Sequence, residues 1–352
     1  MASVLITGGC GFIGSNLALA FLRQGDAVTC FDNLSRRGSD LLRARVEAQG
    51  ARFVKGDIRN AADFDQLAGP FHLMIECSAE PSVLAGTTES GARFMIDNNL
   101  IGSVQCFEYA RAHRIPVLFL STSRVYPYDR INALPFSEDA TRVRCQGQGP
   151  GIGPAGLSED FPLGGVRSMY GATKLASELL LVEYSRQFDL PALINRCGVV
   201  AGPWQLGKTD QGVFTFWMAS HFYGKPLTYI GFGGRGHQVR DVLHIDDLVD
   251  LMLQQARRIG EFRGEVYNVG GGAASSLSLA ETTQLCARIS GRTVAVGSSP
   301  DTRPADVLWY VTDARRAGEV FGWKPARDGE RVLRDIHGWL AQHGEEFRSV
   351  LA

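Results

Sequence analysis

Short, continuous apolar runs alternate with stretches of helical spacing in the first half of the chain. The apolar runs stand at residues 4–6, 28–31, 53–54, 73–76 and 117–120. Helical patterns lie between them, for example at 12–24 and 101–113. Continuous apolar runs are typical of strands buried on both faces, and their alternation with helices indicates a parallel sheet covered by helices. The sequence therefore predicts an α/β fold with a doubly wound parallel sheet.

The second half of the chain has a mixed pattern. Strand-like runs at 192–200, 227–230, 238–244, 266–269 and 294–296 alternate with helical patterns at 213–223, 248–256 and 279–289. Glycine clusters at 231–236 and 270–272 mark turns between them. We expect a smaller α/β domain in this half.

One long stretch, residues 128–165, interrupts the alternation. It is rich in Gly, Pro and charged residues, and it shows little periodicity. A loop of this length inside a compact domain is usually functional or mobile. A tolerated surface insertion is an equally good interpretation.

Composition and charge exclude several classes of protein. The 352 residues include 36 Lys and Arg against 37 Asp and Glu, so the net charge is −1. This balance argues against a general binder of nucleic acid or acidic lipid. No apolar run approaches the ~20 residues that span a membrane, and no secretory signal is readable. The seven cysteines form no C-x-x-C pair, which argues against a zinc ribbon or disulfide framework. We therefore expect a cytoplasmic protein without a metal site or a membrane partner.

A glycine-rich loop follows the first apolar run and opens the first helical segment. Gly9, Gly11 and Gly14 satisfy G-x-G-x-x-G, and Gly8 extends the pattern by one glycine. Glycines here allow a tight turn, close approach of a pyrophosphate to the backbone, and packing of helix on strand. The helix would also present its first N–H groups and its positive dipole end to phosphate. The loop predicts a dinucleotide site in a Rossmann-type sheet.

An acidic residue at the end of the second apolar run supports this prediction. Asp32 stands 18 residues after Gly14, where it can accept both hydroxyls of an adenosine ribose. A carboxylate in this place favours NAD over NADP, whose 2′-phosphate it would repel. Arg36 and Arg37 leave NADP open, because a guanidinium could bind that phosphate.

Tyr170 and Lys174 form a candidate proton-transfer pair. The spacing Y-x-x-x-K occurs once in this chain and places both side chains on one helix face. A tyrosine ordinarily has a pKa near 10, and a nearby ammonium lowers the pKa of a phenol toward that of a usable base. A hydroxyl donor is expected from Ser121-Thr122-Ser123, at the carboxyl edge of the sheet. An exposed Tyr/Lys pair and a turn-capping hydroxyl are the structural alternatives.

Together these features resemble the extended short-chain dehydrogenase/reductase family of nucleotide-sugar epimerases and dehydratases. The resemblance covers nearly the whole chain. It rests on Thr7 to Gly14, Asp32, Asp57-Ile58, Asp97-Asn98-Asn99, Ser121 to Tyr126, Tyr170 with Lys174, Arg240-Asp241 with 244–247, and Arg303-Pro304. It implies an NAD-dependent isomerase acting on a nucleotide sugar, and a homodimer formed through the helix that carries Tyr170 and Lys174.

The resemblance also assigns residues to each ligand. The catalytic group would be Thr122, Tyr170 and Lys174, because the hydroxyl of the family stands three positions before the valine of Val125-Tyr126. The cofactor residues, besides Tyr170 and Lys174, would be Gly8, Gly11, Phe12, Ile13, Gly14, Asp32, Asn33, Asp57, Ile58 and Asn99. The substrate residues would be Thr122, Ser123, Asn195, Gly212, Val213, Tyr229, Arg240 and Arg303. For either arginine, a surface ion pair is the structural alternative.

Domain boundaries follow from the same resemblance. Residues 1–195, 237–263 and 305–320 would form the NAD-binding Rossmann domain. Residues 196–236, 264–304 and 321–352 would form the nucleotide-sugar-binding domain.

Four segments narrow the resemblance to enzymes that epimerise C2 of CDP-paratose or CDP-tyvelose. They are residues 137–145, 195–198 with 210–212, and 236–244. The catalytic group of Thr122, Tyr170 and Lys174 does not determine which carbon is epimerised. A 4-epimerase of UDP-hexoses or UDP-uronates therefore stays open. A non-catalytic NAD sensor and an ordinary NADPH reductase are further alternatives. A 4,6-dehydratase would carry an Asp-Glu pair after Thr122, where this chain has Ser123-Arg124.

Overall fold

The computed structural model describes residues 1–207 and 211–351, which form two compact units. The first unit comprises Met1–Val125, Met169–Arg196 and Val249–Tyr267, and the second comprises Tyr126–Ser168, Cys197–Leu248 and Asn268–Ala352. Asp210, part of one segment that carries the subfamily resemblance, lies outside the described residues. Residues 126–168 and 237–248, which the sequence analysis assigned to the NAD-binding domain, belong to the second unit. Which domain binds which ligand stays a prediction.

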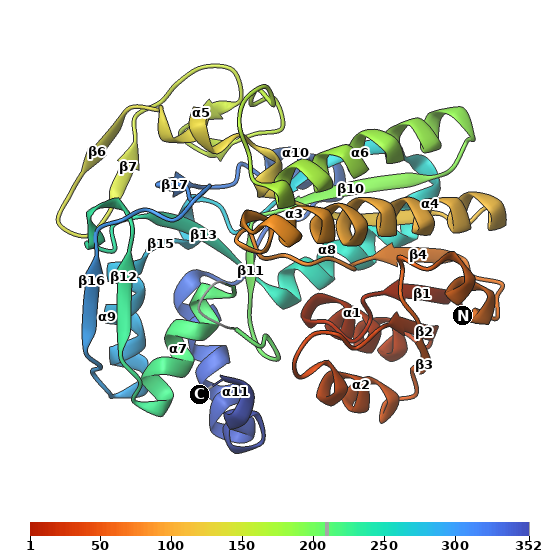
Figure 1. Cartoon of the computed structure of the whole chain (residues 1–352), viewed down its shortest axis with the longest axis horizontal. Helices are drawn as coiled ribbons and strands as arrows, with labels where there is room; N and C mark the ends of the chain where they lie inside the picture. Colours follow the sequence, from red (N-terminus) through yellow and green to blue (C-terminus); the bar gives the residue numbers. More distant parts are fainter. Residues whose placement is uncertain (208–210, 352) are drawn as a thin grey trace. The chain divides into compact units, whose positions relative to one another are not determined.

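A seven-stranded sheet forms the centre of the first unit (Figure 1). Its order is β3-β2-β1-β4-β5-β10-β14, and the pairs from β3 to β5 run parallel. The strands are β1 (Ser3–Thr7), β2 (Ala27–Asp32), β3 (Arg52–Lys55), β4 (Leu73–Glu76), β5 (Val117–Thr122), β10 (Ala192–Cys197) and β14 (Arg263–Val269). The chain leaves β1 in both directions across the sheet, as in a doubly wound Rossmann fold. The predicted α/β class is therefore confirmed.

Helices connect these strands and cover the sheet. They are α1 (Phe12–Arg23), α2 (Ser39–Glu47), α3 (Glu89–Met95), α4 (Gly102–His113), α6 (Met169–Gln187) and α8 (Ile245–Arg258). A π-helical segment, η3 (Ile96–Ile101), joins α3 to α4, and short 3₁₀ segments η1 (Ala61–Gln66) and η4 (Ser123–Val125) follow β3 and β5. Helices α4 and α6 lie side by side and pack against each other (Figure 1).

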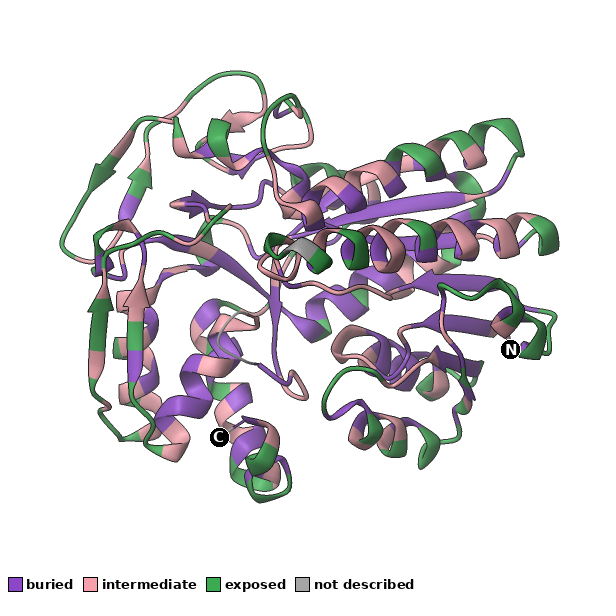
Figure 2. Ribbon diagram, viewed as in Figure 1, coloured by how far each residue is buried: buried purple, intermediate pink, exposed green. Residues whose placement is uncertain are grey.

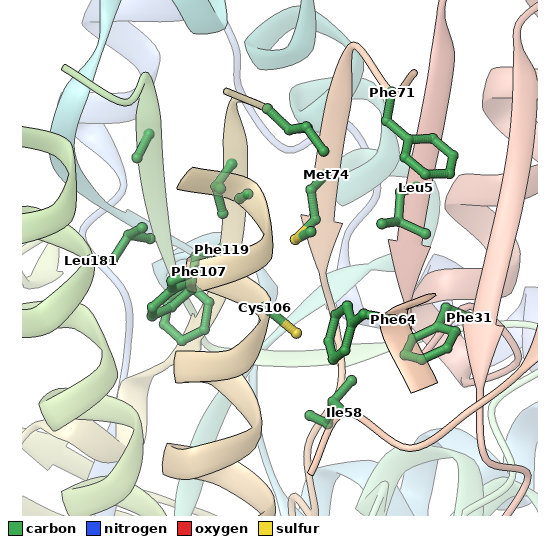
Figure 3. Packing of buried hydrophobic residues seen from close by; sticks show 14 of the residues in the cluster. Leu5, Phe31, Ile58, Phe64, Phe71, Met74, Cys106, Phe107, Phe119 and Leu181 are labelled. Atoms are coloured by element: carbon green, nitrogen blue, oxygen red, sulfur yellow. The ribbon is translucent and has the colours of Figure 1, made fainter. Parts of the chain in front are cut away.

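One apolar cluster lies between the sheet and these two helices. Figure 3 shows Met74 of β4 and Phe119 of β5 together with Cys106 and Phe107 of α4. The rings of Phe107 and Phe119 meet edge to face at 5.4 Å. Every residue of β4 and β5 is buried, and Figure 2 shows the same for most of the sheet. The continuous apolar runs in the sequence thus reflect strands covered on both faces.

The second unit contains smaller sheets. Strand β13 (Val239–His244) pairs with β11 (Val199–Ala201), β15 (Ser276–Ser278) and β17 (Trp309–Tyr310), and β12 (Leu227–Ile230) pairs with β16 (Val296–Ser299). Its larger helices are α7 (Val213–Tyr223), α9 (Leu279–Ser290), α10 (Arg315–Phe321) and α11 (Gly329–Leu351). The single strand expected at 192–200 is instead divided at Gly198 into β10 and β11, and Gly198 donates its N–H to the carbonyl of Val269.

The stretch from 128 to 165 contains regular structure, which corrects the expectation of a long loop. It forms α5 (Tyr128–Asn132) and two hairpins, β6 (Phe136–Glu138) with β7 (Val143–Cys145) and β8 (Ile152–Gly153) with β9 (Gly156–Leu157). Arg142 fixes the first hairpin through an ion pair with Glu281 and a 2.7 Å bond to the carbonyl of Ser276. Strands of two or three residues are too short to show a period of two, so the sequence pattern missed them.

Within residues 1–207 and 211–351, no helix is both long and apolar enough to cross a membrane. All seven cysteines are free.

Candidate functional site

The glycine-rich loop turns tightly between β1 and α1. Gly8 has a left-handed φ of 66° and donates its N–H to the carbonyl of Phe31 at 2.9 Å. A Cβ at Gly14 would lie 2.3 Å from the carbonyl oxygen of Gly8, so any side chain there would clash with the turn. Helix α1 begins at Phe12, with Gly11 as its N-cap and no capping bond from a side chain of the described residues. The N–H groups of its first turn, at Phe12 and Ile13, are thus suited to bind phosphate.

Asp32, at the end of β2, closes this loop from the neighbouring strand. Its Oδ2 accepts the N–H of Cys10 at 3.0 Å, and its Oδ1 accepts the N–H of Leu34 at 2.8 Å. Burial raises the pKa of Asp32, and the two N–H groups oppose that rise. Loop, helix terminus and carboxylate together have the shape and donor set that fit a dinucleotide such as NAD.

The other predicted cofactor residues lie in the same unit. Asn33 donates to Asp57 at 3.0 Å, and Arg59 donates to the same carboxylate at 2.9 Å, which holds the pKa of Asp57 at about 2. Ile58 is buried where α4 begins, since a Cβ at Gly102 would lie 2.5 Å from its Cδ1.

Asn99 is fully buried in η3. Its Oδ1 accepts the N–H of Glu80 at 2.8 Å and its Nδ2 donates to the carbonyl of Glu80 at 2.9 Å. Its own carbonyl accepts bonds from Ser103 of α4 and Ser177 of α6. Asn99 therefore joins α4, α6 and the loop after β4.

The proton-transfer pair lies on the buried side of α6. Tyr170 and Lys174 are 9% and 1% exposed. The Nζ of Lys174 lies 3.9 Å from the ring centroid of Phe119 on β5, and 3.6 Å from Oε2 of Glu76 at the end of β4. Because α6 packs against β5 and η4, the pair lies at the carboxyl edge of the sheet, where ligands of such folds bind. The bland alternative, an exposed Tyr/Lys pair, is excluded.

Thr122 and Ser123 complete the predicted group at this edge. Thr122 ends β5, is 8% exposed, and its Oγ1 accepts the N–H of Arg124 at 3.2 Å. Ser123 begins η4 directly after it. The structure thus holds the candidate hydroxyl, phenol and ammonium within one unit, on β5 and on the helix that covers it.

The sequence patterns did not predict two buried carboxylates near Tyr170 and Lys174. Glu76 is paired with Lys174, and Glu178, one turn after Lys174 on α6, accepts bonds from Ser121 and from Arg196 of β10. The Arg196 Nη2 to Glu178 Oε2 distance is 2.7 Å. The available signals were an acid ending the apolar run at 73–76 and an acid continuing the i, i+4 series from Tyr170 and Lys174.

Asn195, a predicted substrate residue, pairs with a second amide side chain. It is fully buried in β10, and its amide exchanges two bonds with the amide of Gln255, at 2.7 and 2.9 Å. The predicted contact of Asn195 with substrate stays a prediction.

The remaining substrate candidates lie in the second unit. Gly212, with a left-handed φ of 69°, is the N-cap of α7, and Val213 is the first residue of that helix. The ring of Tyr229 is stacked on Trp217, at 6.3 Å between centroids, and its hydroxyl donates to Thr283 at 2.8 Å.

Arg240 and Arg303, the two arginines predicted to bind substrate, both form a hydrogen bond with Asp306. Arg240 donates to Asp306 at 2.8 Å, and the carbonyl of Arg303 accepts the N–H of the same Asp306 at 3.2 Å. An ion pair, the structural alternative for Arg240, is therefore present, and binding of a diphosphate by either arginine stays a prediction.

Comparison with known proteins bears on this site. Residues 4–270 match the profile of the family described as NAD dependent epimerase/dehydratase. The chain is 31% identical over 348 residues to CDP-paratose 2-epimerase of Salmonella typhi, covering 96% of this chain and 99% of that protein. It is 27% identical over 362 residues to UDP-glucose 4-epimerase of Erwinia amylovora, covering 97% and 98%.

Solved structures show the same fold. UDP-glucuronic acid 4-epimerase from Bacillus cereus, in complex with UDP-glucuronic acid and NAD, superposes with a TM-score of 0.78 at 23% identity, over 97% of this chain and 99% of that one. At this level of identity the likeness supports the fold alone. The family match, the near full-length relative and the geometry of the loop agree. The chain belongs to the NAD-dependent epimerase/dehydratase family, whose cofactor is NAD.

Proposed function

We propose that this NAD-dependent enzyme epimerises C2 of a CDP-linked dideoxy sugar, interconverting CDP-paratose and CDP-tyvelose. The observation that carries this proposal is the 31% identity to a CDP-paratose 2-epimerase along nearly the full length of both proteins. The buried Tyr170/Lys174 pair at the carboxyl edge of the sheet supplies the residues that such chemistry needs.

Epimerisation at C2 requires that a proton and a hydride leave the carbinol and return. NAD, when bound, supplies reversible acceptance of the hydride. Tyr170 as phenolate removes the proton of the 2-hydroxyl. It gives the proton back after the 2-keto sugar has flipped to its other face within the site. Thr122 donates a hydrogen bond to the reacting oxygen. No net oxidation results, so each cycle ends with the cofactor in its starting state.

Lys174 supports the base in this scheme. Its ammonium is held over the Phe119 ring and beside Glu76, one helical turn from Tyr170. A positive charge near the phenol stabilises phenolate relative to phenol. Substrate binding beyond the reacting sugar falls to Ser123 and Asn195, and to Gly212, Val213, Tyr229, Arg240 and Arg303 of the second unit.

Product analysis with deuterated substrate tests the proposal. CDP-paratose labelled with deuterium at C2 should give CDP-tyvelose that keeps the label, because the hydride returns to the carbon it left. Tyr170→Phe should lower this turnover at least ~100-fold, the usual contribution of a general base. Tyr184→Phe is the matched control, since it removes from the same helix a hydroxyl that donates to the side chain of Glu108; it should keep near-normal turnover.

The second candidate is a 4-epimerase of UDP-hexoses or UDP-uronates, which the 27% identity to a UDP-glucose 4-epimerase favours. Interconversion of UDP-glucose and UDP-galactose, with CDP-paratose left unchanged, would support that alternative and contradict the CDP-sugar assignment. NAD binding without turnover of any nucleotide sugar would favour a sensor instead.

We also propose that the protein is a homodimer formed through α6. Leu179 and Leu180 of this helix are 62% and 38% exposed, and Phe188, directly after its last residue, is 54% exposed. Large apolar side chains are seldom this exposed unless they belong to an interface. The cytoplasmic location expected from the cysteine pattern stays a prediction.

A further inference from the structure

Glu76 is a fully buried carboxylate to which the reaction above gives no role. It ends β4 in register with Thr7 of β1 and Phe119 of β5. Its Oε1 accepts the N–H of Ser78 at 2.9 Å. Its Oε2 lies 3.5 Å from the hydroxyl of Ser103 and 3.6 Å from Nζ of Lys174. One oxygen is therefore fixed by backbone, and the other faces the ammonium.

Because Lys174 is buried, its ammonium needs the contact with Glu76. The residue is 1% exposed, and a buried ammonium is strongly disfavoured unless a counter-charge or equivalent partner replaces its hydration. The face of the Phe119 ring, at 3.9 Å, contributes attraction but carries no net charge. Glu76 is the carboxylate that the structure places beside Nζ.

The other titratable groups around the pair do not replace it. Cys106 of α4 is buried, and burial together with the charge of Glu76 raises the pKa of its thiol, so it is neutral. Glu178, one turn further along α6, is bound to Arg196 of β10 and Ser121 of β5. Thr7 and Phe119 on the flanking strands are uncharged, and Tyr170 is the group acted upon. Burial raises the pKa of Glu76 as well, and the charge of Lys174 opposes that rise.

We propose that Glu76 is a positioning residue, whose carboxylate keeps Lys174 in its ammonium form and in place beside Tyr170. The proposal rests on the function proposed above, in which Tyr170 is the base. Glu76 touches neither substrate nor cofactor in this role and acts through Lys174. Without the carboxylate, the buried ammonium loses its counter-charge and its anchor, and Tyr170 loses the positive charge that stabilises its phenolate.

Titration of the Tyr170 phenol tests the proposal without any substrate. The ionisation is followed by tyrosinate absorbance in NAD-saturated protein, and the signal of Tyr170 is isolated by subtracting the same titration of a Tyr170→Phe partner in each background. Glu76→Gln should move the midpoint upward by about one pH unit or more, a tenfold or larger loss of phenolate at a given pH. A direct effect of Glu76 on the phenol would have the opposite sign, because removing a negative charge stabilises phenolate. A lower or unchanged midpoint would overturn the proposal.

Further variants show whether Glu76 acts through Lys174. Lys174→Met alone should raise the midpoint, and adding Glu76→Gln to it should cause no further rise; an additional rise would overturn the proposal. Glu183→Gln, an exposed acid on the same helix, is the matched control and should leave the midpoint unchanged. If Glu76→Gln does not fold, Glu76→Asp decides, because it keeps the charge but withdraws it by one methylene. A smaller rise then supports the proposal, and no rise contradicts it.

The outcomes separate this proposal from the proposed function. Failure to interconvert CDP-paratose and CDP-tyvelose would leave the titration result standing, since the measurement contains no sugar. A Lys174→Met variant with an unchanged midpoint would instead overturn both the role of Glu76 and the role assigned to the Tyr170/Lys174 pair.

Discussion

Gly14 and Gly338 differ sharply in the space that each leaves for a side chain. A Cβ at Gly14 would lie 2.3 Å from the carbonyl oxygen of Gly8, in the phosphate loop, whereas a Cβ at Gly338, within α11, would meet no atom within 4 Å. The first glycine is required by the close approach of a helix to its own preceding turn. The second only costs the helix conformational entropy.

We therefore expect opposite effects from the same substitution. Gly14→Ala should lower the free energy of unfolding by about 1–3 kcal/mol, as overpacking does, and should abolish NAD binding measured by calorimetry. Gly338→Ala should raise the free energy of unfolding by about 0.5–1 kcal/mol and leave NAD binding intact. Unfolding in urea gives both free energies, and normal NAD affinity in Gly14→Ala would contradict the assigned role of the loop.

Asp57 offers a pH-dependent contribution to stability. Bonds from Arg59 and Asn33 lower its pKa to about 2 from an ordinary value of 3.8, so the folded state favours the carboxylate. The stabilisation is fully present above pH 3.8 and is lost as the pH falls toward about 2. Because Arg59 is 40% exposed, we expect about 1 kcal/mol at neutral pH.

The variant Asp57→Asn measures this contribution. Its free energy of unfolding should lie below that of the unmodified protein at neutral pH, and the difference should shrink as the pH falls through the window given above. Asp65→Asn, at an exposed position in η1, should stay within about 0.5 kcal/mol of the unmodified protein. A difference for Asp57→Asn that does not change with pH would mean that the charge is not its source.

At the scale of elements, α6 is fixed to the sheet by charged groups on its buried side. Lys174 contacts Glu76 of β4, and Glu178 binds Arg196 of β10 and Ser121 of β5. Tyr170, Lys174 and Glu178 follow one another at intervals of four, so one helix face carries the base, its ammonium and the anchor. The orientation of the base relative to Thr122 therefore depends on how this helix is held.

Glu178→Gln should destabilise the fold strongly. The variant removes the charge of the carboxylate that pairs with the buried guanidinium of Arg196, 7% exposed, and we expect a loss of about 3–5 kcal/mol in the free energy of unfolding. Glu183→Gln, on the exposed side of α6, should change it by less than about 0.5 kcal/mol. The double variant Glu178→Gln/Arg196→Met should recover much of the loss. Without such recovery, the loss of the Glu178–Arg196 ion pair would not explain the effect.

At the scale of the whole molecule, the proposed dimer would bury the exposed apolar residues Leu179 and Leu180 of α6 and Phe188 directly after it. Leu179→Arg combined with Phe188→Arg should convert the proposed dimer into a monomer, because charges would be buried in an apolar interface. Val166→Arg is the matched control, since Val166 is a similarly exposed apolar residue that precedes α6 and lies outside the proposed interface. Sedimentation velocity distinguishes the two states. A monomeric unmodified protein, or a dimer that survives both substitutions, would contradict the proposal.

The sequence by itself determined the sheet, the glycine-rich loop, Asp32 and the Tyr170/Lys174 pair. These features depend on local patterns: buried parallel strands require continuous apolar runs, and a phosphate loop requires glycines at fixed intervals. The sequence patterns did not predict helices α2, α10 and α11. The strands of the hairpins within 128–165 were too short to produce an alternating pattern.

Only the tertiary structure decided which buried polar groups meet. Three such pairs join residues that are distant in sequence or belong to different elements: Glu76 with Lys174, Glu178 with Arg196, and Asn195 with Gln255. No local sequence pattern predicts these pairs. A buried charge or amide acquires its partner from the packing of strands and helices, because desolvation makes the unpaired group costly wherever the chain folds around it. The lysine was thus readable from its spacing to Tyr170, while the carboxylate beside it became visible only when β4 and α6 were brought together.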